Sequence, residues 1–179
     1  MKREKNYLNI FIRYLIILII GLIFYFTPIA DYILLMLTIY PISFLLDLFF
    51  ESFVHSNYIF LESIVIEIIP ACVAVSAYFL LLILNLTTPM KKAIRARSLI
   101  FSLLLLLVIN ISRIFILSVM LINDFSYFDI THKVFWYVLS ILIVVGIWFL
   151  TVYRYKIKAI PGYTDLIFLK KQLNKSKAS

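Results

Sequence analysis

The sequence predicts an all-α integral membrane protein, on the strength of its composition, the length of its apolar runs and the placement of its charges. Hydrophobic residues make up 64% of the 179 residues and charged residues only 15%, with a mean hydropathy of +1.07. This composition leaves too little polar surface to coat a soluble globule. Four apolar runs approach the roughly 20 residues that cross a bilayer: residues 10–28, 71–88, 99–122 and 134–153. We expect helices there, because lipid offers no partner to free backbone groups.

The charges indicate how these helices are oriented. The formal net charge is +8, and 15 of the 17 lysines and arginines fall in three groups. The groups are Lys2, Arg3, Lys5 and Arg13; Lys91, Lys92, Arg95 and Arg97; and Arg154, Lys156, Lys158, Lys170, Lys171, Lys175 and Lys177. The positive-inside rule puts all three groups and both termini on the cytoplasmic side of a multi-pass cell-membrane protein. The basic charge is therefore an orientation signal, with some attraction for anionic lipid headgroups, and we expect no nucleic-acid partner.

Residues 1–29 are expected to form an N-terminal anchor span. Basic residues precede or begin its apolar stretch, as in a signal sequence, but no small-residue cleavage site follows at Thr27-Pro28. We therefore interpret the segment as a retained anchor.

Residues 30–70 are expected to form a re-entrant and outer segment. Residues 30–53 are apolar but carry three acidic residues and are interrupted by Pro41, which favours a re-entrant or interfacial helical pair. Residues 57–70 alternate apolar residues with Glu62 and Glu67, which favours a short hairpin or strand-like segment on the outer side. The chain must cross an even number of times between two cytoplasmic segments, so we expect about four full transmembrane helices. Six is the alternative, if residues 30–53 and 57–70 both cross.

The remaining chain is expected to complete a single membrane domain over residues 1–179. Residues 71–153 are predicted to form a three-helix core, followed by a basic cytoplasmic tail at residues 154–179. The sequence has no glycine-rich phosphate loop and no Cys/His set with metal-ligand spacing, so no cofactor and no metal are expected.

Cys72, the only cysteine, is the candidate nucleophile. It follows Pro70-Ala71 and is expected in the first turn of its helix, where free N–H groups favour an anion and can lower the pKa of a thiol. The alternative is a buried, inert cysteine, which is common in apolar helices.

Arg113 lies in the middle of the apolar run at residues 99–122, where an arginine requires a partner or a polar cavity. Asn110 lies three residues earlier on the same helical face, so the two form a polar stripe that faces the bundle interior. The structural alternative is an ion pair of Arg113 with Glu67, Asp124 or Asp129, or simple snorkelling to the interface.

His132 opens the last span and is the candidate general base or acid. Asp129 at the N-cap or the Thr131 hydroxyl is expected to hold the imidazole in one tautomer. An isolated histidine at the end of a span is otherwise an interfacial residue.

Residues 66–82 (IEIIPACVAVSAYFLLL), the NISRI motif at residues 110–114 and His132 after a short loop resemble the exosortase/archaeosortase family, over approximately residues 57–153. Members of that family are membrane proteins and proposed transpeptidases of C-terminal sorting signals. The resemblance implies that Cys72 is the nucleophile, that Arg113 stabilises the anion and that His132 transfers the proton. One difference is that many members have Cys-Ser-Gly or Cys-Thr-Gly where this chain has Cys72-Val73-Ala74.

The predicted function is therefore that of a membrane-embedded cysteine protease or transpeptidase. It would cleave C-terminal sorting signals of exported surface proteins at the outer membrane boundary, through a thioester intermediate. Its partners would be membrane-anchored protein substrates, with a lipid or another amine as acceptor, and its active site would be extracytoplasmic. The alternative is a small membrane substrate-binding subunit of a transporter, in which Arg113 binds an anionic ligand and Cys72 is dispensable.

Overall fold

The computed structural model describes residues 2–26, 28–61, 64–165, 167 and 170. Its elements follow one another as helices α1 (Lys2–Phe26) and α2 (Ile29–Asp47), strands β1 (Ser52–His55), β2 (Tyr58–Leu61) and β3 (Val65–Glu67), helices α3 (Pro70–Val73), α4 (Val75–Thr87), α5 (Lys92–Ile122) and α6 (Phe128–Val134), the π-helical turn η1 (Phe135–Leu139) and helix α7 (Ser140–Tyr155). The predicted helical class is confirmed, with one small sheet inserted between α2 and α3.

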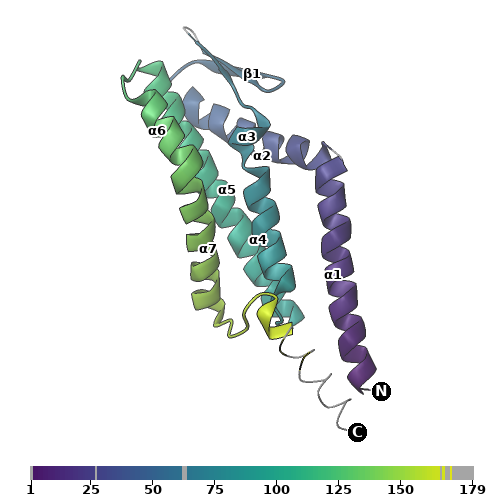
Figure 1. The fold of residues 1–179 in the computed structure, drawn as a ribbon. Helices are drawn as coiled ribbons and strands as arrows, with labels where there is room; N and C mark the ends of the chain where they lie inside the picture. Colours follow the sequence, from purple (N-terminus) through teal and green to yellow (C-terminus); the bar gives the residue numbers. More distant parts are fainter. Residues whose placement is uncertain (1, 27, 62–63, 166, 168–169, 171–179) are drawn as a thin grey trace.

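The long helices form a bundle that the second helix and the sheet cover at one end. Helices α1, α4, α5 and α7 run side by side along the molecule, and α4 contacts α1, α5 and α7 (Figure 1). Helix α2 instead crosses the upper end of the bundle, where it packs on α5 and on β1 (Figure 1). The sheet and α2 therefore form one end of the molecule, to which α3 also belongs.

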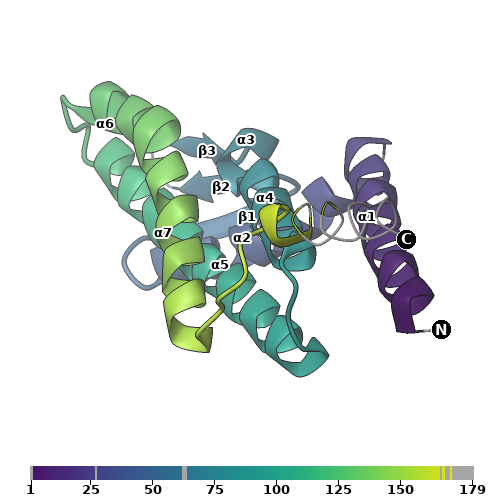
Figure 2. The same ribbon diagram turned by 60° about the horizontal axis from the view of Figure 1, so that its bottom comes forward.

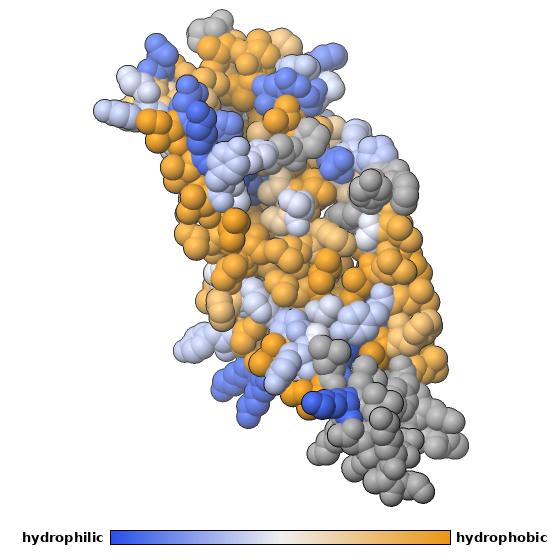
Figure 3. All heavy atoms as spheres, viewed as in Figure 1, coloured by the Kyte–Doolittle hydropathy of each residue, from blue (hydrophilic) through white to orange (hydrophobic). Residues whose placement is uncertain are grey.

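In the part of the chain that the structure describes, three helical segments are long and apolar enough to cross a membrane: α2, α5 and the continuous run α6–η1–α7 at Phe128–Tyr155. The apolar stretches Ile10–Ile23 in α1 and Val75–Thr87 in α4 are shorter. The surface agrees with a membrane protein, because apolar atoms form a broad band between two ends at which hydrophilic residues gather (Figure 3).

The expected run at residues 71–88 is not one helix. It is divided at Ala74, whose backbone is left-handed with φ 59° and ψ 37°, so the short α3 precedes the 13-residue α4. At 1.5 Å per residue, α4 alone is about 20 Å long, which is less than the hydrocarbon thickness of roughly 30 Å.

The expected helical pair at residues 30–53 is also wrong. The segment is one helix of 19 residues that continues through Pro41, and strand β1 begins at Ser52. A proline in a helix removes one backbone donor but leaves the neighbouring turns intact when the surrounding structure supports them. Here Ile39 and Ile42, on either side of Pro41, are fully buried, and this packing holds the helix together.

The sheet is antiparallel with the strand order β1-β2-β3. The predicted strand-like segment at residues 57–70 contains β2 and β3, with residues 62–63 outside the described part. Ile59 and Ile66 are paired across the strands and both point into the core, while Phe53 and Phe60 stack with ring centroids 4.8 Å apart. The face that carries Ile59 and Ile66 packs on α2 and joins Ile114 of α5 in one apolar cluster, whereas the Phe53–Phe60 stack lies on the opposite face.

A buried polar cluster joins the lower halves of α4 and α5. Asn85 donates to the Ser102 hydroxyl at 3.2 Å and accepts from the Ser98 hydroxyl at 2.8 Å, and all three side chains are buried. Such contacts between apolar helices fix their register. The register matters for the site, because it sets Arg113 of α5 against the segment that carries Cys72.

Candidate functional site

Cys72 lies on α3, a single helical turn that enters the bundle from β3. Its N–H donates to the carbonyl of Ile69 at 2.8 Å, and its free thiol is half-buried. The prediction of a first-turn cysteine is confirmed, but the helix behind it has only four residues. The left-handed Ala74 ends that helix, so the macrodipole of α4 is not aligned behind the thiol.

The chemical environment of the Cys72 thiol differs from the expected one. Cys72 lies outside the apolar helices that are candidates to cross the membrane. Burial raises the pKa of its thiol above the usual value, and the Arg113 guanidinium and a backbone hydrogen bond at Ile69 only partly offset that rise. The net direction of the pKa shift is therefore opposite to the lowering that the sequence led us to expect.

Arg113 and Asn110 both donate to the carbonyl oxygen of Cys72. The Nη2 atom of Arg113 and the Nδ2 atom of Asn110 each lie 3.1 Å from that oxygen, and both side chains are buried. The predicted polar stripe on α5 is confirmed, as is its direction into the bundle. The guanidinium contacts the backbone of Cys72 and so helps to hold the chain segment that carries the thiol.

Within the described part of the chain, Arg113 has no carboxylate partner. The Arg13–Asp165 pair is the ion pair found there, so the alternative pairings of Arg113 with Glu67, Asp124 or Asp129 are absent. The Nε atom of Arg113 is buried and has no hydrogen-bond partner. The site therefore holds an uncompensated positive charge. Burial of such a charge is energetically costly.

Ser140 is a site residue that the sequence did not reveal. Its hydroxyl accepts from Nη1 of Arg113 at 3.1 Å and donates to the Phe135 carbonyl at 2.7 Å. Phe135 begins the π-helical turn η1, and the backbone N–H of Ser140 also bonds its carbonyl. Such turns commonly occur at functional sites, and this one orients a hydroxyl toward the guanidinium.

His132 lies on α6 between two aromatic side chains. Its ring stacks on Phe128 with centroids 5.7 Å apart and meets Trp136 edge-on at 6.4 Å. The expected role of Asp129 is wrong: Tyr127 is the N-cap of α6 without a side-chain bond, and Asp129 is exposed. Packing against Phe128 and Trp136, one helical turn away on each side, therefore holds the imidazole in place of a carboxylate.

One cavity of about 170 Å³ brings the three predicted catalytic residues together. It is lined by Val65, Ile66, Glu67, Ile68, Cys72, Arg113, Ile114, Leu117, Ser118, Leu121, Phe128 and His132. Asn110 lies behind it, against the Cys72 carbonyl, and Asp129 is not part of it. Among the described residues the thiol and the imidazole share the cavity without a hydrogen bond between them, an arrangement that often tightens only when substrate binds.

No protein-family model, curated protein or solved structure matches this chain. The class of the protein therefore follows from its fold and site: a small helical membrane protein with a cysteine, an arginine and a histidine around one cavity.

Proposed function

We propose that this protein is a membrane-embedded cysteine peptidase or transpeptidase that cleaves C-terminal sorting signals of exported, membrane-anchored proteins. The observation that supports this most directly is the cavity in which Cys72, Arg113 and His132 meet. A nucleophile, a cation without a carboxylate partner and a proton carrier are the groups that acyl transfer through a thioester requires.

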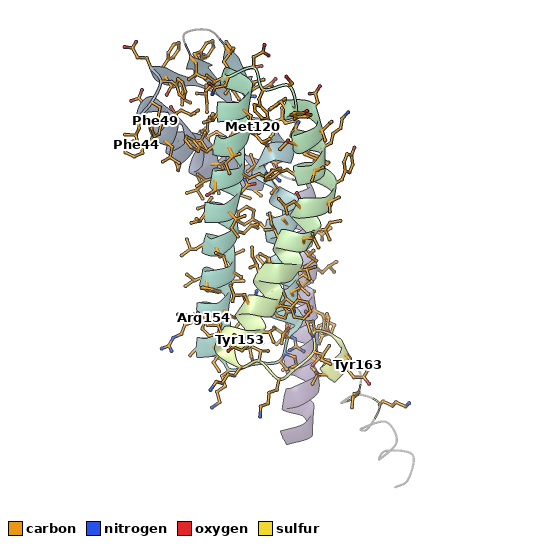
Figure 4. The ribbon with its side chains drawn as sticks, turned by 90° about the vertical axis from the view of Figure 1, so that its left-hand side faces the viewer. Phe44, Phe49, Met120, Tyr153, Arg154 and Tyr163 are labelled. Atoms are coloured by element: carbon orange, nitrogen blue, oxygen red, sulfur yellow. The ribbon has the colours of Figure 1, made fainter. Side chains whose placement is uncertain are left out.

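The proposed topology has four crossings, made by α1, by α4, which α3 extends to the outer boundary, by α5 and by the run α6–η1–α7. The direction of α2 across the bundle end (Figure 1) favours an interfacial helix. Phe44 and Phe49 lie at that end, whereas Tyr153, Arg154 and Tyr163 lie toward the other (Figure 4). Since the positive-inside rule assigns the basic end to the cytoplasm, the cavity opens at the outer boundary.

The reaction begins when His132 takes the proton of the Cys72 thiol. The sulfur attacks the scissile carbonyl carbon, and the positive charge of Arg113 stabilises the negative oxygen that develops there. As the C–N bond breaks, His132 returns its proton to the departing amine and an acyl thioester remains on Cys72. Water or the amine of an acceptor, such as an aminolipid, then attacks the thioester, and the displaced sulfur regains the proton of the attacking group through His132.

The edge of the sheet suggests how a peptide reaches Cys72. Strand β3 is the last in the order β1-β2-β3 and lies beside α3 (Figure 2). Four consecutive residues, Val65 to Ile68, line the cavity, which is the signature of a strand edge, since a strand face presents alternate residues. An extended substrate pairs with this edge by main-chain hydrogen bonds.

The register identifies which backbone groups of β3 are free to pair. The N–H of Ile68 donates to Asn57 at 2.8 Å and the carbonyl of Ile64 accepts from Leu61 at 3.0 Å. Because these groups alternate in direction along an antiparallel strand, Val65 and Glu67 direct their N–H and C=O outward to the substrate.

A second function is favoured by the uncompensated charge of Arg113. In a substrate-binding subunit of a transporter, the guanidinium would bind an anionic ligand inside the cavity. Cys72 would then be dispensable, so the two functions differ in what the thiol must do.

The deciding experiment co-expresses the protein with a membrane-anchored reporter that carries a C-terminal sorting signal. We expect processing by the wild type and an acyl adduct on Cys72 in the intact-protein mass spectrum. Cys72→Ala is expected to insert and fold normally but to leave the reporter whole. Processing by Cys72→Ala at the wild-type rate would exclude the peptidase and favour the binding subunit.

A further inference from the structure

A second cavity lies at the opposite end of α5 from Cys72. It has a volume of about 640 Å³ and lies between the middle of α1, the start of α5 and the C-terminal segment. The described residues of its wall include three cations, Arg13, Lys92 and Arg95, and one carboxylate, Asp165. Asp165 is buried and already paired with Arg13, so the cavity keeps a net positive charge.

The cations in this cavity keep unused donors. Arg13 contacts Asp165 and Arg95 donates to the Thr88 carbonyl at 3.2 Å, yet the Nε atoms of both are buried without a hydrogen-bond partner among the described residues. Lys92 is exposed and opens the 31-residue helix α5, whose N-cap Lys91 provides no side-chain bond to the first turn. The positive end of the helix dipole therefore adds to the three cations.

The other wall of the cavity is apolar and open. Ile12 and Ile16 lie one turn apart on α1 beside Arg13, and their exposed fractions are 42% and 45%. A soluble ion would gain no favourable contact from such an apolar wall. A phosphate attached to an acyl chain uses both parts: the cations hold its head, and its chain lies along α1.

We propose that this cavity binds the headgroup of an anionic phospholipid from the cytoplasmic leaflet. Arg13, Lys92 and Arg95 contact the phosphate oxygens, and the acyl chain follows Ile12 and Ile16. Arg95 and Arg113 are 18 residues apart on α5, which is about 27 Å at 1.5 Å per residue. A lipid clamped at Arg95 therefore holds Arg113 and Cys72 near the far boundary of a hydrocarbon core roughly 30 Å thick. This site stands independently of the proposed peptidase activity.

The test measures phosphatidylglycerol bound to the full-length protein by native mass spectrometry, with phosphatidylcholine as the reference lipid. The double variant Lys92→Gln/Arg95→Gln removes two cations from the cavity wall. Lys91→Gln/Arg97→Gln is the matched control, because it removes two exposed cations of the same segment that do not line the cavity. Surface cations near a membrane contribute roughly 1 kcal/mol each, or about fivefold in affinity. We therefore expect about a 25-fold loss of phosphatidylglycerol binding in the first variant and little loss in the control.

Equal losses in the two double variants would overturn the proposal, because they would indicate general surface attraction. So would no loss in either. If Arg95→Gln prevents folding, the single variants Lys92→Gln and Lys91→Gln provide the same comparison at about fivefold. Displacement of phosphatidylglycerol by millimolar inorganic phosphate or glycerol phosphate would also overturn it, in favour of a site for a soluble phosphate compound.

Discussion

The Arg113 guanidinium donates a hydrogen bond to the carbonyl oxygen of Cys72, a residue 41 positions earlier in the chain. The contact joins the buried charge of α5 to the short turn that carries the only thiol. Arg113 thus both holds the segment that carries Cys72 and supplies positive charge beside its thiol, and these two contributions can be separated by substitution.

Removal of the charge is expected to make the Cys72 thiol harder to ionise. Because the Arg113 guanidinium lowers the pKa of that thiol, Arg113→Gln raises the pKa further, and the alkylation profile moves to higher pH. At any pH below the pKa, this rise lowers the thiolate fraction and with it the rate of alkylation. The measurement is the rate of maleimide reaction against pH, with Arg97→Gln as the control. An identical profile for wild type and Arg113→Gln would remove the electrostatic coupling on which the site depends.

Arg113→Lys separates charge from geometry. Lysine keeps the positive charge but has one nitrogen, which cannot reach both Cys72 and Ser140 as the planar guanidinium does. We expect an alkylation profile closer to the wild type than that of Arg113→Gln, together with poor reporter processing. Full processing would mean that charge alone is sufficient.

Ser140 is predicted to be a positioning residue for Arg113. Ser140→Ala removes the acceptor of Nη1, and a hydrogen bond to a charged group contributes about 1.5–3 kcal/mol. We expect reporter processing to fall at least tenfold with a small displacement of the Cys72 alkylation profile, and Ser140→Thr to restore both. Ser112→Ala is the control, because the exposed Ser112 hydroxyl bonds only Val108 of its own helix. A loss of the same size in Ser112→Ala would assign the effect to helix stability.

The cavity is predicted to open on the extracytoplasmic side. In intact cells a membrane-impermeant maleimide is expected to label Cys72, more slowly than a fully exposed thiol because Cys72 is half-buried. In the Cys72→Ala background, Ser126→Cys at the outer turn labels readily, and Tyr153→Cys at the basic end labels only after the membrane is opened. The reverse labelling pattern would mean that the cavity opens on the cytoplasmic side.

Part of the site could be predicted from the sequence because the governing interactions are local. Asn110 and Arg113 are three residues apart, so any helix places them on one face. A buried arginine requires a polar environment. This requirement correctly predicted that Arg113 faces the bundle interior, where Cys72 lies. The three-residue spacing between Asp129 and His132 gave a wrong prediction, because α6 begins at a different residue from the one its composition favours.

Other parts depend on packing between distant segments. Ser140 is one of several serines in apolar helices, and only the π-helical turn at Phe135–Leu139 directs it to Arg113. The acidic residues and Pro41 favoured an interfacial position for residues 30–53, but the direction of α2 across the bundle end comes from its contacts with the sheet and α5. The break after Val73 was also missed, because alanine is rarely left-handed and is a good helix former.

The left-handed break at Ala74 gives a prediction about stability. Replacing alanine by glycine is expected to have different effects at Ala74 and at Ala77. Ala74 has φ 59°, a conformation that costs a residue with a Cβ about 1–2 kcal/mol, whereas glycine adopts it freely at an entropic cost of about 0.5–1 kcal/mol. Ala74→Gly is therefore expected to leave stability unchanged or to raise it by up to about 1.5 kcal/mol.

Ala77→Gly is the matched control. Ala77 lies inside α4, where glycine lowers the stability by about 1 kcal/mol relative to alanine because of its poor helix propensity. Ala74→Val is expected to destabilise by more than about 1 kcal/mol, since a β-branched side chain fits the left-handed region poorly. Thermal unfolding of the three variants in one detergent measures the differences. If Ala74→Gly destabilises as much as Ala77→Gly, residues 71–88 form one continuous helix. In that case Cys72 lies at the first turn of that long helix, and the macrodipole then favours its thiolate.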